Sequence, residues 1–338
     1  MTFLETPHGL LRLPAFLPDG TQGVVKTVDA ADVEQCGVQA IMVNTLHLSS
    51  APGTSRVAAL GGIHHFMGWR GPLASDSGGF QAFSLVAGSR KLGSISKDGF
   101  LYRLDKSNDK KILTPEKCIR KQFEIGADIL FCLDHCTHPE ADARTQRESV
   151  DNTISWARRC KAEFVKRIEG KGATGRVPRL FAVVQGGSDE ALRSECIERL
   201  LEIGFDGYGY GGWPIDDEGR LVDMVGFVAQ RIPREFPLHA LGIGKPEGIL
   251  GAWAAGYCMF DCVLPTRDAR RKRLYMFNPG WEERCAKGTD LYDYLYLQDD
   301  RHGNADIPLD ESCDCMTCQR YSRSEERRVG KECRSRWS

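Results

Sequence analysis

The feature that most constrains the fold of this chain is a regular alternation of short apolar runs with longer amphipathic segments. Each short run is almost continuously hydrophobic, which is typical of a strand buried on both faces of a parallel sheet. The short runs are AIMVN (40–44), PLASD (72–76), DILFCLD (128–134), FAVVQGG (181–187), GYGYGG (207–212), HALGIG (239–244) and CMFDCV (258–263). Between them, the segments 114–126, 151–170 and 188–204 combine helix-start residues, an apolar stripe and a closing glycine, and predict helices.

This alternation predicts an α/β protein built on one (β/α)8 barrel of the TIM-barrel type. The pattern continues over about 260 residues, which is the usual size of such a barrel. A doubly wound sheet fits less well, because no glycine-rich dinucleotide fingerprint follows the first strand. The segment 88–113 interrupts the rhythm and predicts a β-hairpin insertion.

We therefore predict three regions along the chain. Residues 1–283 form the barrel, with additions at the N-terminus and at 88–113, and residues 284–323 form a small C-terminal zinc-binding appendage. The last stretch, 324–338, differs in composition and lacks apolar periodicity. Its sequence resembles the translation of sequencing-adapter DNA. We therefore expect this stretch to be non-native and the natural chain to continue differently after Arg323. Resequencing the source gene across this point tests that expectation.

Composition narrows the cellular context. The 45 basic and 46 acidic residues give a formal net charge of -1, so a polyanionic partner must be held by a local basic patch. No stretch approaches the ~18 apolar residues of a membrane span, and the N-terminal segment does not resemble a secretory signal. Most of the 13 cysteines are scattered through apolar runs, which indicates free thiols. We expect a cytoplasmic protein that does not associate with membranes.

Polar residues stand at the ends of the predicted strands. In a barrel these ends meet at one face, where the active site of this fold lies. Burying acids and amides costs free energy unless they are paired, so their recurrence at one face predicts a functional site. Asn44 fits equally well as the N-cap of the following helix. The strand-end residues are Asn44, Asp76, Asp134, Gln185, Gly212 and Asp261.

The chemistry of these side chains indicates action on a nucleoside. Two carboxylates, Asp76 and Asp261, suit a glycosidic reaction in which one is the nucleophile and the other the general acid and base. Phe80 offers a flat apolar face for a heterocycle. Asp134 and Gln185 carry hydrogen-bonding groups that match the edge of a purine-like base, and a hydrogen-bonded core pair is the alternative.

A run of cations follows Asp261. Five of the seven residues from 267 to 273 are basic. Beside a candidate nucleophile they predict a site for the phosphates of a nucleic acid. The alternative is a solvated surface loop with Asp268 as a partial partner. The cations are Arg267, Arg270, Arg271, Lys272 and Arg273.

Three cysteines near the C-terminus, Cys313, Cys315 and Cys318, predict a structural Zn2+ site. Three thiolates within six residues are typical of zinc ligands in a reducing compartment. Tetrahedral zinc needs a fourth ligand, and none of the eight histidines lies after Cys318. His302 and Cys333 are nearby candidates, but neither has a typical spacing. We expect the fourth ligand to be absent or replaced in this chain.

Several of these motifs together resemble the tRNA-guanine transglycosylases. SDSGGFQAFSL, VVQGG, GYGYGGW, LGIGKP, FDCVLPTR and CDCMTCQRYSR occur in the order and spacing of that family, and the likeness covers residues 5–323. The pairing of DSGGFQ with FDCVLPTR is highly specific. The resemblance implies a barrel enzyme with a C-terminal zinc site. Such an enzyme exchanges guanine at the wobble position of tRNA for a 7-deazaguanine base, a step in queuosine biosynthesis.

The resemblance also implies roles for individual residues. Asp261 matches the nucleophile that forms a covalent aspartyl-ribose intermediate with tRNA, and Asp76 matches the general acid and base. The zinc ligands would be the three clustered cysteines and a later histidine that this chain lacks. The resemblance also implies a dimer with the zinc regions near the interface, and we expect this chain to form a homodimer. The positions that match the base pocket are Phe80, Asp134, Gln185, Gly212, Trp213 and Leu241.

This chain departs from the bacterial pattern where the pocket holds the substituent of the base. His135 stands where those members usually have glutamate, Trp213 where they have leucine, and Leu241 where methionine is common. Cys136 and Ile215 keep bulk in this region, which favours the small aminomethyl-deazaguanine over the larger queuine. We expect His135 to pack against the pocket wall rather than bind the base.

Other functions are also compatible with parts of the pattern. A non-catalytic tRNA-binding subunit of a heteromeric transglycosylase should have lost one acid, but both Asp76 and Asp261 are present. A nucleoside hydrolase or glycosidase on the same barrel would need neither the zinc cluster nor the basic run. A related base-exchange enzyme could use queuine or another deazaguanine.

Overall fold

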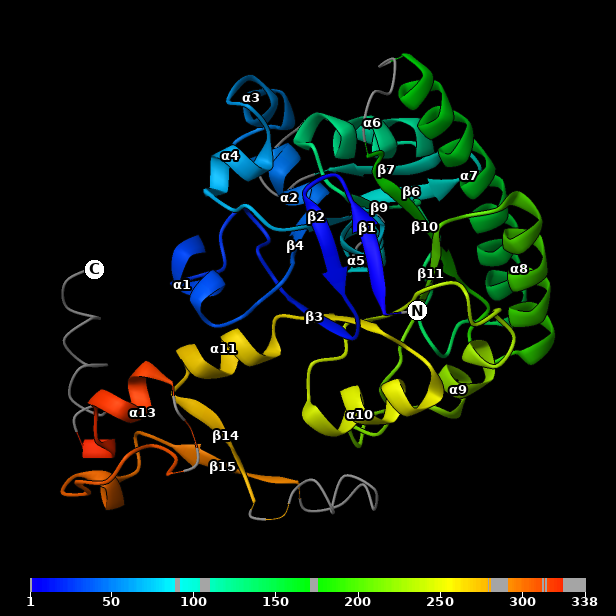
Figure 1. Cartoon of the computed structure of the whole chain (residues 1–338). Coiled ribbons are helices and arrows are strands. Elements are labelled where there is room, and N and C mark those ends of the chain that lie inside the picture. Colours follow the sequence, from blue (N-terminus) through cyan, green and yellow to red (C-terminus); the bar gives the residue numbers. More distant parts are fainter. Residues whose placement is uncertain are drawn as a thin grey trace. The chain divides into compact units, whose positions relative to one another are not determined.

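The computed structural model divides the chain into two compact units (Figure 1). It describes residues 2–88, 92–103, 110–170, 176–278, 280, 291–311, 313 and 315–324. The first unit comprises Met1–Gly244 and Gly251–Val263, and the second comprises Lys245–Leu250 and Leu264–Ser338. The boundary predicted at 283 falls within 281–290, which lies outside the described residues, and the predicted non-native tail, 324–338, lies outside them except for Ser324. These two expectations stay predictions.

The first unit is the predicted barrel. Eight parallel strands form one sheet in the order β3-β13-β12-β11-β10-β9-β5-β4. A parallel bridge between Asp19 and Met42 brings the two end strands together, so the sheet is nearly closed. The strands are β3 (Ala15–Pro18), β4 (Ile41–Asn44), β5 (Leu73–Asp76), β9 (Ile129–Phe131), β10 (Arg179–Val184), β11 (Gly207–Tyr210), β12 (Leu238–Leu241) and β13 (Met259–Cys262).

Strand β3 is the one barrel strand that the apolar runs did not single out. It has only four residues and lies between Pro14 and Asp19, so its apolar stretch is too short to stand out from a turn-rich segment. Its partner is β13, which follows far later in the sequence, and Leu17 lies opposite Asp261. Tertiary pairing therefore completes the barrel where the local pattern is weak.

Inward-facing side chains fill the barrel. Alternate residues of a strand point to the same side, and Ala15 and Leu17 of β3 and Phe181 and Val183 of β10 enter one buried cluster. Leu4 and Leu11 join the same cluster from a two-stranded antiparallel hairpin, β1 (Phe3–Thr6) and β2 (Gly9–Arg12). The hairpin therefore plugs one end of the barrel, while the carboxyl ends of the strands meet at the other.

Most helices of the first unit lie around the outside of the strands (Figure 1). Helix α6 begins after the N-cap Thr114 and ends at the left-handed Gly126, as predicted. Helix α7 begins eight residues earlier than predicted, because the Asp142 carboxylate accepts a hydrogen bond from the Thr145 backbone N at 2.7 Å. The helices of the first unit are α1 (Ala30–Gln35), α2 (Thr45–Ser50), α3 (Thr54–Ala59), α4 (Ile63–Met67), α5 (Gly79–Gly88), α6 (Pro115–Ile125), α7 (Ala143–Gly170), α8 (Glu190–Ile203) and α9 (Asp223–Ala229).

The interruption predicted at 88–113 is an antiparallel element. Its strands are β6 (Gly93–Ser96), β7 (Gly99–Arg103) and β8 (Lys110–Leu113), which pair in that order. A third strand joins the predicted hairpin. The Trp156 indole of α7 donates to the Lys97 carbonyl at 2.8 Å and ties this small sheet to the barrel.

The second unit is small and carries the cysteine cluster. Strands β14 (Arg273–Phe277) and β15 (Tyr292–Tyr296) pair antiparallel around a core of Leu295, Leu297 and Leu309. The other elements are α11 (Leu264–Arg270), η1 (Asp300–His302) and α13 (Met316–Arg320), and α10 (Pro246–Ala255) begins in this unit and ends in the first.

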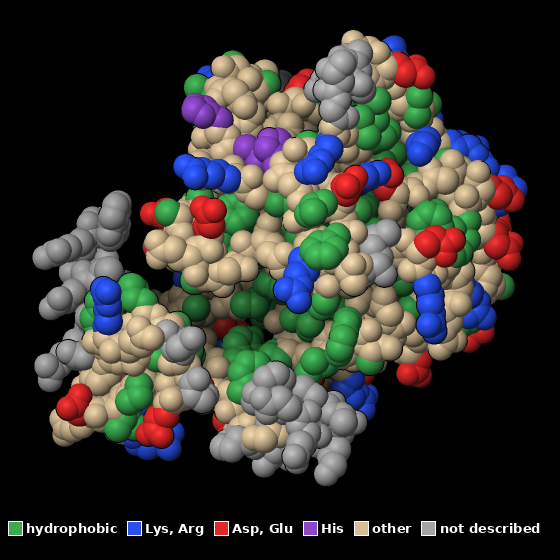
Figure 2. All heavy atoms as spheres, in the orientation of Figure 1, with side chains coloured by type: hydrophobic (Ala, Val, Ile, Leu, Met, Phe, Trp, Pro, Cys, Tyr) green, Lys and Arg blue, Asp and Glu red, His purple; other side chains and the backbone are tan. Residues whose placement is uncertain are grey.

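Charge is mixed over the surface. On the face of the barrel unit presented in Figure 2, Lys and Arg side chains alternate with Asp and Glu rather than forming one basic field. This agrees with the near-zero net charge of the sequence. Among the described helices, none is both long and apolar enough to cross a membrane.

Candidate functional site

A cavity of about 480 Å³ opens at the carboxyl ends of the barrel strands. This is the face at which barrel enzymes carry their active sites. It brings together seven of the eight residues predicted to be catalytic or base-binding, and the eighth, Gln185, is hydrogen-bonded to one of them. The seven that line it are Asp76, Phe80, Asp134, Gly212, Trp213, Leu241 and Asp261.

Asp261 ends strand β13 and is held by the neighbouring strand. The His239 Nε2 lies 2.8 Å from Asp261 Oδ1, and the Gly242 backbone N donates to the same oxygen at 3.3 Å. His239 is fully buried, and its Nδ1 has no hydrogen-bond partner among the described residues. A neutral imidazole with its proton on Nε2 satisfies this arrangement, because a second N–H at Nδ1 would be buried without an acceptor. His239 therefore orients the carboxyl group of Asp261.

His239 was not singled out from the sequence. It occupies the second position of the strand LHAL, where the neighbouring residues are apolar and buried. A polar residue inside a buried strand is itself a signal, because burial without a partner costs free energy. Its partner lies 22 residues away and is visible only in the folded barrel.

Asp76 ends strand β5 and is surrounded by donors. Asn44 Nδ2 donates to its Oδ2 at 2.6 Å, and the Thr45 backbone N donates to its Oδ1 at 2.9 Å. Burial raises the pKa of Asp76 to about 7, with a further rise from the charge of Asp261, while the Thr45 hydrogen bond opposes this. Such a carboxyl group can both release and accept a proton near neutral pH.

Asn44 combines the two roles weighed from the sequence. Its side-chain oxygen caps helix α2 by accepting from the His47 backbone N at 2.9 Å, and its amide nitrogen donates to Asp76. The helix cap thus fixes the orientation of a group that lines the cavity.

Asp134 and Gln185 form a buried pair at the cavity wall. Gln185 Nε2 donates to Asp134 Oδ2 at 2.6 Å, and Ser77 Oγ lies 3.5 Å from Oδ1. Burial raises the pKa of Asp134 to about 6, although the Gln185 hydrogen bond opposes the shift. The two residues are therefore the hydrogen-bonded pair considered as the alternative. Because Asp134 also lines the cavity, the pair can still present an acceptor to a ligand.

A buried arginine holds the loops that follow β10 and β11. The Arg193 guanidinium of helix α8 donates to the carbonyls of Val184 at 2.6 Å, Gly187 at 2.9 Å and Gly211 at 2.9 Å. It lies over the Tyr210 ring and is 1% exposed. Arg193 was not singled out from the sequence, although it falls on the buried face of α8, where an arginine needs a structural reason.

The glycines of these loops allow a close approach. Gly212 has a φ of +95°, which disfavours other residues. A Cβ on Gly211 would lie 2.5 Å from Gln185 Nε2, so a side chain there would displace the amide that pairs with Asp134.

Two aromatic side chains present exposed rings at the cavity. Phe80 is 47% exposed and Trp213 is 41% exposed, and their ring centroids lie 5.9 Å apart in an edge arrangement. The Trp213 indole donates to the Thr137 carbonyl at 3.2 Å, which fixes its orientation. Large exposed rings beside hydrogen-bonding groups suit the binding of a flat heterocycle.

His135 packs behind the cavity wall, as expected. Its ring stacks on Trp156 with centroids 5.9 Å apart, and its Nδ1 lies 3.1 Å from Asn152 Nδ2. Burial lowers the pKa of His135 to about 4, so the ring is neutral. The departure from glutamate at this position therefore places an uncharged group here.

The cations that follow Asp261 in sequence belong to the second unit. Arg267 and Arg270 lie in α11, Arg271 and Lys272 in the following turn, and Arg273 in β14. Arg273 donates to the buried Asp268 at 2.7 Å, and Tyr275 donates to the same carboxylate. Asp268 is therefore a partner, as the surface-loop alternative proposed. Binding of phosphates by this run stays a prediction.

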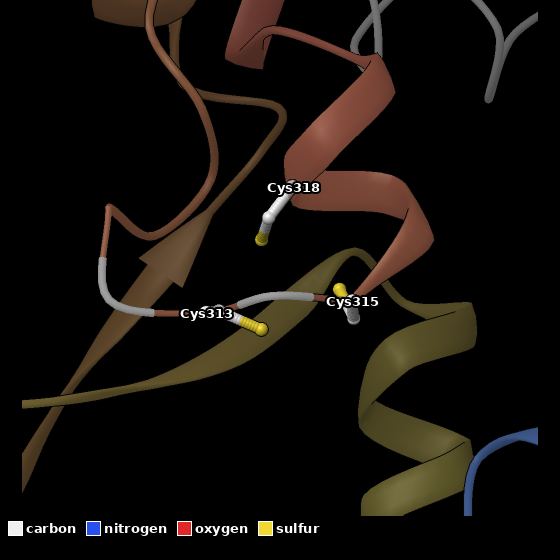
Figure 3. Close-up of side chains that lie close together, drawn as sticks. All are labelled: Cys313, Cys315 and Cys318. Carbon is white, nitrogen blue, oxygen red and sulfur yellow. The ribbon is translucent and has the colours of Figure 1, made fainter.

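Three sulfur atoms gather in the second unit. The Sγ atoms of Cys313, Cys315 and Cys318 all lie within 4.8 Å of one another. Figure 3 shows Cys318 on helix α13 facing the loop that carries the other two. Three exposed or half-buried thiols in this arrangement fit a zinc ion. Among the described residues, no fourth ligand belongs to the group, and Cys333 lies outside them.

A second polar cluster lies at the opposite end of the barrel. The buried Asp128 accepts from His8 Nδ1 at 2.7 Å and from His64 Nε2 at 3.0 Å. The backbone N atoms of His8 and Leu73 also donate to this carboxylate. Asp128 precedes β9 and Leu73 begins β5, so the cluster lies at the amino ends of the strands. Its hydrogen bonds join the plug hairpin to the barrel.

Comparison with known proteins gives one family. A family profile described as queuine tRNA-ribosyltransferase matches residues 1–334. A protein of that name from Solidesulfovibrio magneticus is 38% identical over 322 residues, covering 95% of this chain and 80% of the relative. Proteins of the same name from Thermoanaerobacter pseudethanolicus and Psychrobacter sp. are 36% and 35% identical, covering 95% and 94% of this chain and 79% and 78% of the relatives.

Proposed function

The chain belongs to the queuine tRNA-ribosyltransferase family, and from that premise we propose that it exchanges guanine at the wobble position of tRNA for a 7-deazaguanine base. The observation that carries this proposal is that Asp76 and Asp261 line one cavity. The hydrogen-bonded pair of Asp134 and Gln185 and the exposed aromatic rings lie at the same cavity. Both acids are present, so a non-catalytic subunit is not favoured.

The first half of the reaction releases guanine. A carboxylate oxygen of Asp261 attacks C1′ of the wobble nucleoside, and the bond from C1′ to the guanine N9 breaks. Among the described residues, Asp261 accepts hydrogen bonds only through its Oδ1, which leaves Oδ2 for the attack. Protonated Asp76 gives its proton to the departing guanine and becomes a carboxylate. The tRNA is then joined to Asp261 through C1′.

The second half inserts the new base. Ionised Asp76 takes the proton from N9 of the incoming deazaguanine, and this nitrogen displaces Asp261 from C1′. Asp76 returns to its protonated form, and two displacements at C1′ keep the original configuration. A carboxyl group with a pKa of about 7 suits both transfers.

Base recognition is assigned to the remaining groups of the cavity. Ionised Asp134, oriented by Gln185, accepts from the N–H groups of the guanine-like edge, and Phe80 and Trp213 cover the ring faces. The loop at Gly212 lets the base approach the backbone. The cavity wall includes the bulky side chains of Trp213, Leu241 and Ile215, which restrict the space for a large substituent on the base. We therefore propose the aminomethyl-deazaguanine, rather than queuine, as the incoming base.

The second unit is proposed to serve the nucleic acid and the metal. Arg267, Arg270, Arg271, Lys272 and Arg273 would contact tRNA phosphates. One Zn2+ held by the three clustered cysteines would tie the C-terminal segment together. We further propose a homodimer that acts in the cytoplasm, where thiols stay reduced and tRNA is present.

The decisive experiment is exchange of labelled guanine in a tRNA with a wobble guanine. Aminomethyl-deazaguanine should displace the label, and queuine should compete poorly. Asp261→Asn should form no covalent tRNA adduct on a denaturing gel, whereas Asp76→Asn should mainly stop turnover. An adduct trapped with Asp261→Asn would refute the role of that residue.

Metal content tests the zinc site separately from activity. We expect one zinc per chain by elemental analysis of the purified protein, and loss of that zinc together with a lower melting temperature in Cys318→Ser. Cys36→Ser is the matched control, because Cys36 is an exposed thiol far from the cluster in sequence. Equal zinc in both variants would rule out the site.

A further inference from the structure

Asp19 follows strand β3 and lines the cavity between the two proposed catalytic carboxylates. Strand β3 neighbours β13, with Leu17 opposite Asp261, and the Asp19–Met42 bridge joins it to β4. The next strand, β5, ends in Asp76. Leu17 enters the barrel core, so Asp19, two residues later, points to the same side one layer nearer the cavity mouth.

The Asp19 carboxyl group is half-buried, and one of its two oxygens accepts a hydrogen bond from within the described part of the protein. Its Oδ1 accepts a hydrogen bond from the Thr21 hydroxyl. Its Oδ2 has no donor among the described residues, and the described lining of the cavity contains no lysine or arginine. The free oxygen can therefore accept a hydrogen bond from a bound molecule.

We propose that Asp19 accepts a hydrogen bond from the 2′-hydroxyl of the ribose that is attacked at C1′. The inference rests on the base exchange proposed above. Strands β3 and β4 lie between β13, which carries Asp261, and β5, which ends in Asp76. A sugar that reaches both acids therefore lies beside the ends of these two strands, where Asp19 lines the cavity. The 2′-carbon is bonded to C1′, so its hydroxyl is adjacent to the reacting atom. DNA lacks this hydroxyl, which makes the contact specific to RNA.

The contact also has a catalytic consequence. As the bond to guanine breaks, positive charge develops at C1′. A hydrogen bond from the neighbouring hydroxyl to an anion strengthens as this charge develops, which lowers the barrier. From the usual strength of a hydrogen bond to a charged group, we expect the contact to change the rate ~10- to 100-fold.

A purely electrostatic role is the alternative that the test must separate. The charge of Asp19 is among the causes that raise the pKa of Asp76. If this were its whole function, removal of Asp19 would move the alkaline limb of the pH profile. It would also affect ribose and deoxyribose substrates equally.

The experiment uses two anticodon stem-loops that differ only at the wobble sugar, guanosine in one and 2′-deoxyguanosine in the other. The value of kcat/KM for guanine exchange is measured for the wild type, Asp19→Ala and Asp19→Asn. Glu34→Gln is the matched control, because it removes an exposed acid of the same unit outside the cavity. A third stem-loop carries the deoxy sugar at the 5′ neighbour.

The wild type and Glu34→Gln should prefer ribose at the wobble position ~10- to 100-fold. In Asp19→Ala this ratio should fall close to one, because the rate on the ribose substrate should fall more than the rate on the deoxyribose substrate, and Asp19→Asn should be intermediate. The stem-loop with the deoxy sugar at the 5′ neighbour should lose the same fraction of kcat/KM in the wild type and in the Asp19 variants. If Asp19→Ala does not fold, Asp19→Asn carries the comparison, because it preserves the shape of the side chain.

Three results would overturn the proposal. One is an unchanged ribose preference in both Asp19 variants. Another is an equal loss on both sugars. The third is a loss that follows the neighbouring sugar instead. Absence of exchange by the wild type on either stem-loop would instead refute the proposed function itself, and the inference with it.

Discussion

At the scale of single residues, burial raises the pKa of two carboxyl groups at the cavity, and their neighbours then shift the two values in opposite directions. Burial raises the pKa of Asp76 to about 7 and that of Asp134 to about 6. The charge of Asp261 raises the pKa of Asp76 further, whereas the Gln185 hydrogen bond holds that of Asp134 lower. Near neutral pH one carboxyl group can therefore donate a proton while the other accepts a hydrogen bond, which is the division of labour that base exchange requires.

The pH dependence of exchange should follow from these two groups. As pH rises through about 6, Asp134 loses its proton and becomes the acceptor that binds the base, so kcat/KM should increase. As pH rises through about 7, Asp76 loses the proton it must give to guanine, so kcat/KM should decrease. Rates measured from about pH 5 to about pH 9 check this. A profile that is flat between these limits would contradict it, and Asp134→Asn should lack the acidic limb.

His239 is expected to act as a positioning residue for Asp261. His239→Phe removes the hydrogen bond at 2.8 Å while keeping a ring in the buried strand. We expect kcat to fall ~10- to 100-fold with little change in KM for tRNA. His239→Gln is the control, because its amide can donate to the same carboxylate and should restore part of the rate. Equal effects of both substitutions, or a change confined to KM, would contradict this role.

At the scale of elements, the loops after the strands are shaped by a buried helix residue. Helix α8 packs so that Arg193 reaches back to the ends of β10 and β11. Its hydrogen bonds satisfy loop carbonyls that would otherwise be unpaired next to the cavity. The position of Gly212 at the cavity therefore depends on a residue that does not line the cavity.

Removing this arginine should affect both stability and base binding. Arg193→Met keeps much of the apolar stem but leaves three carbonyls without a donor. We therefore expect the free energy of unfolding to fall by about 3 kcal/mol. KM for the base should increase, because the loops that carry Gln185 and Gly212 lose the hydrogen bonds from Arg193 that hold them in place. Denaturant unfolding and exchange kinetics measure the two effects. Arg199→Met, on the exposed face of the same helix, should change neither.

At the scale of the whole molecule, the two ends of the barrel carry different features. The carboxyl ends of the strands carry the cavity, and the amino ends carry the Asp128 cluster under the plug hairpin. Residues at the amino end of such a barrel contribute stability rather than chemistry. The separation predicts that damage at one end leaves the function of the other intact while the fold persists.

Asp128→Ala tests this separation. It leaves two imidazoles and two backbone N–H groups without their acceptor, which should cost about 3 kcal/mol of stability. The melting temperature should fall by roughly 5–10 °C, while kcat at low temperature stays close to the wild-type value. His65→Ala is the control, since His65 is exposed next to the cluster. A large loss of kcat in folded Asp128→Ala protein would contradict the assignment.

The sequence by itself determined the barrel and most of its cavity. Alternating apolar runs and capped helices are local patterns, because burial on both faces and helix capping act over a few residues. The strand-end acids followed from the same pattern, since parallel strands bring their ends to one face. The cysteine cluster was also local, with three thiols close in sequence that lie close in space.

The tertiary structure alone decided the contacts that tune the site. The contacts of His239 with Asp261 and of Arg193 with three loop carbonyls depend on neighbours that are separated along the chain. The same is true of the place of Asp19 at the cavity, because β3 pairs with the strand that carries Asp261. The pairing of β3 with β13 likewise joins the two ends of the barrel sequence. A polar side chain gains its role from the groups that burial places around it, and those groups are brought together only when the sheet closes.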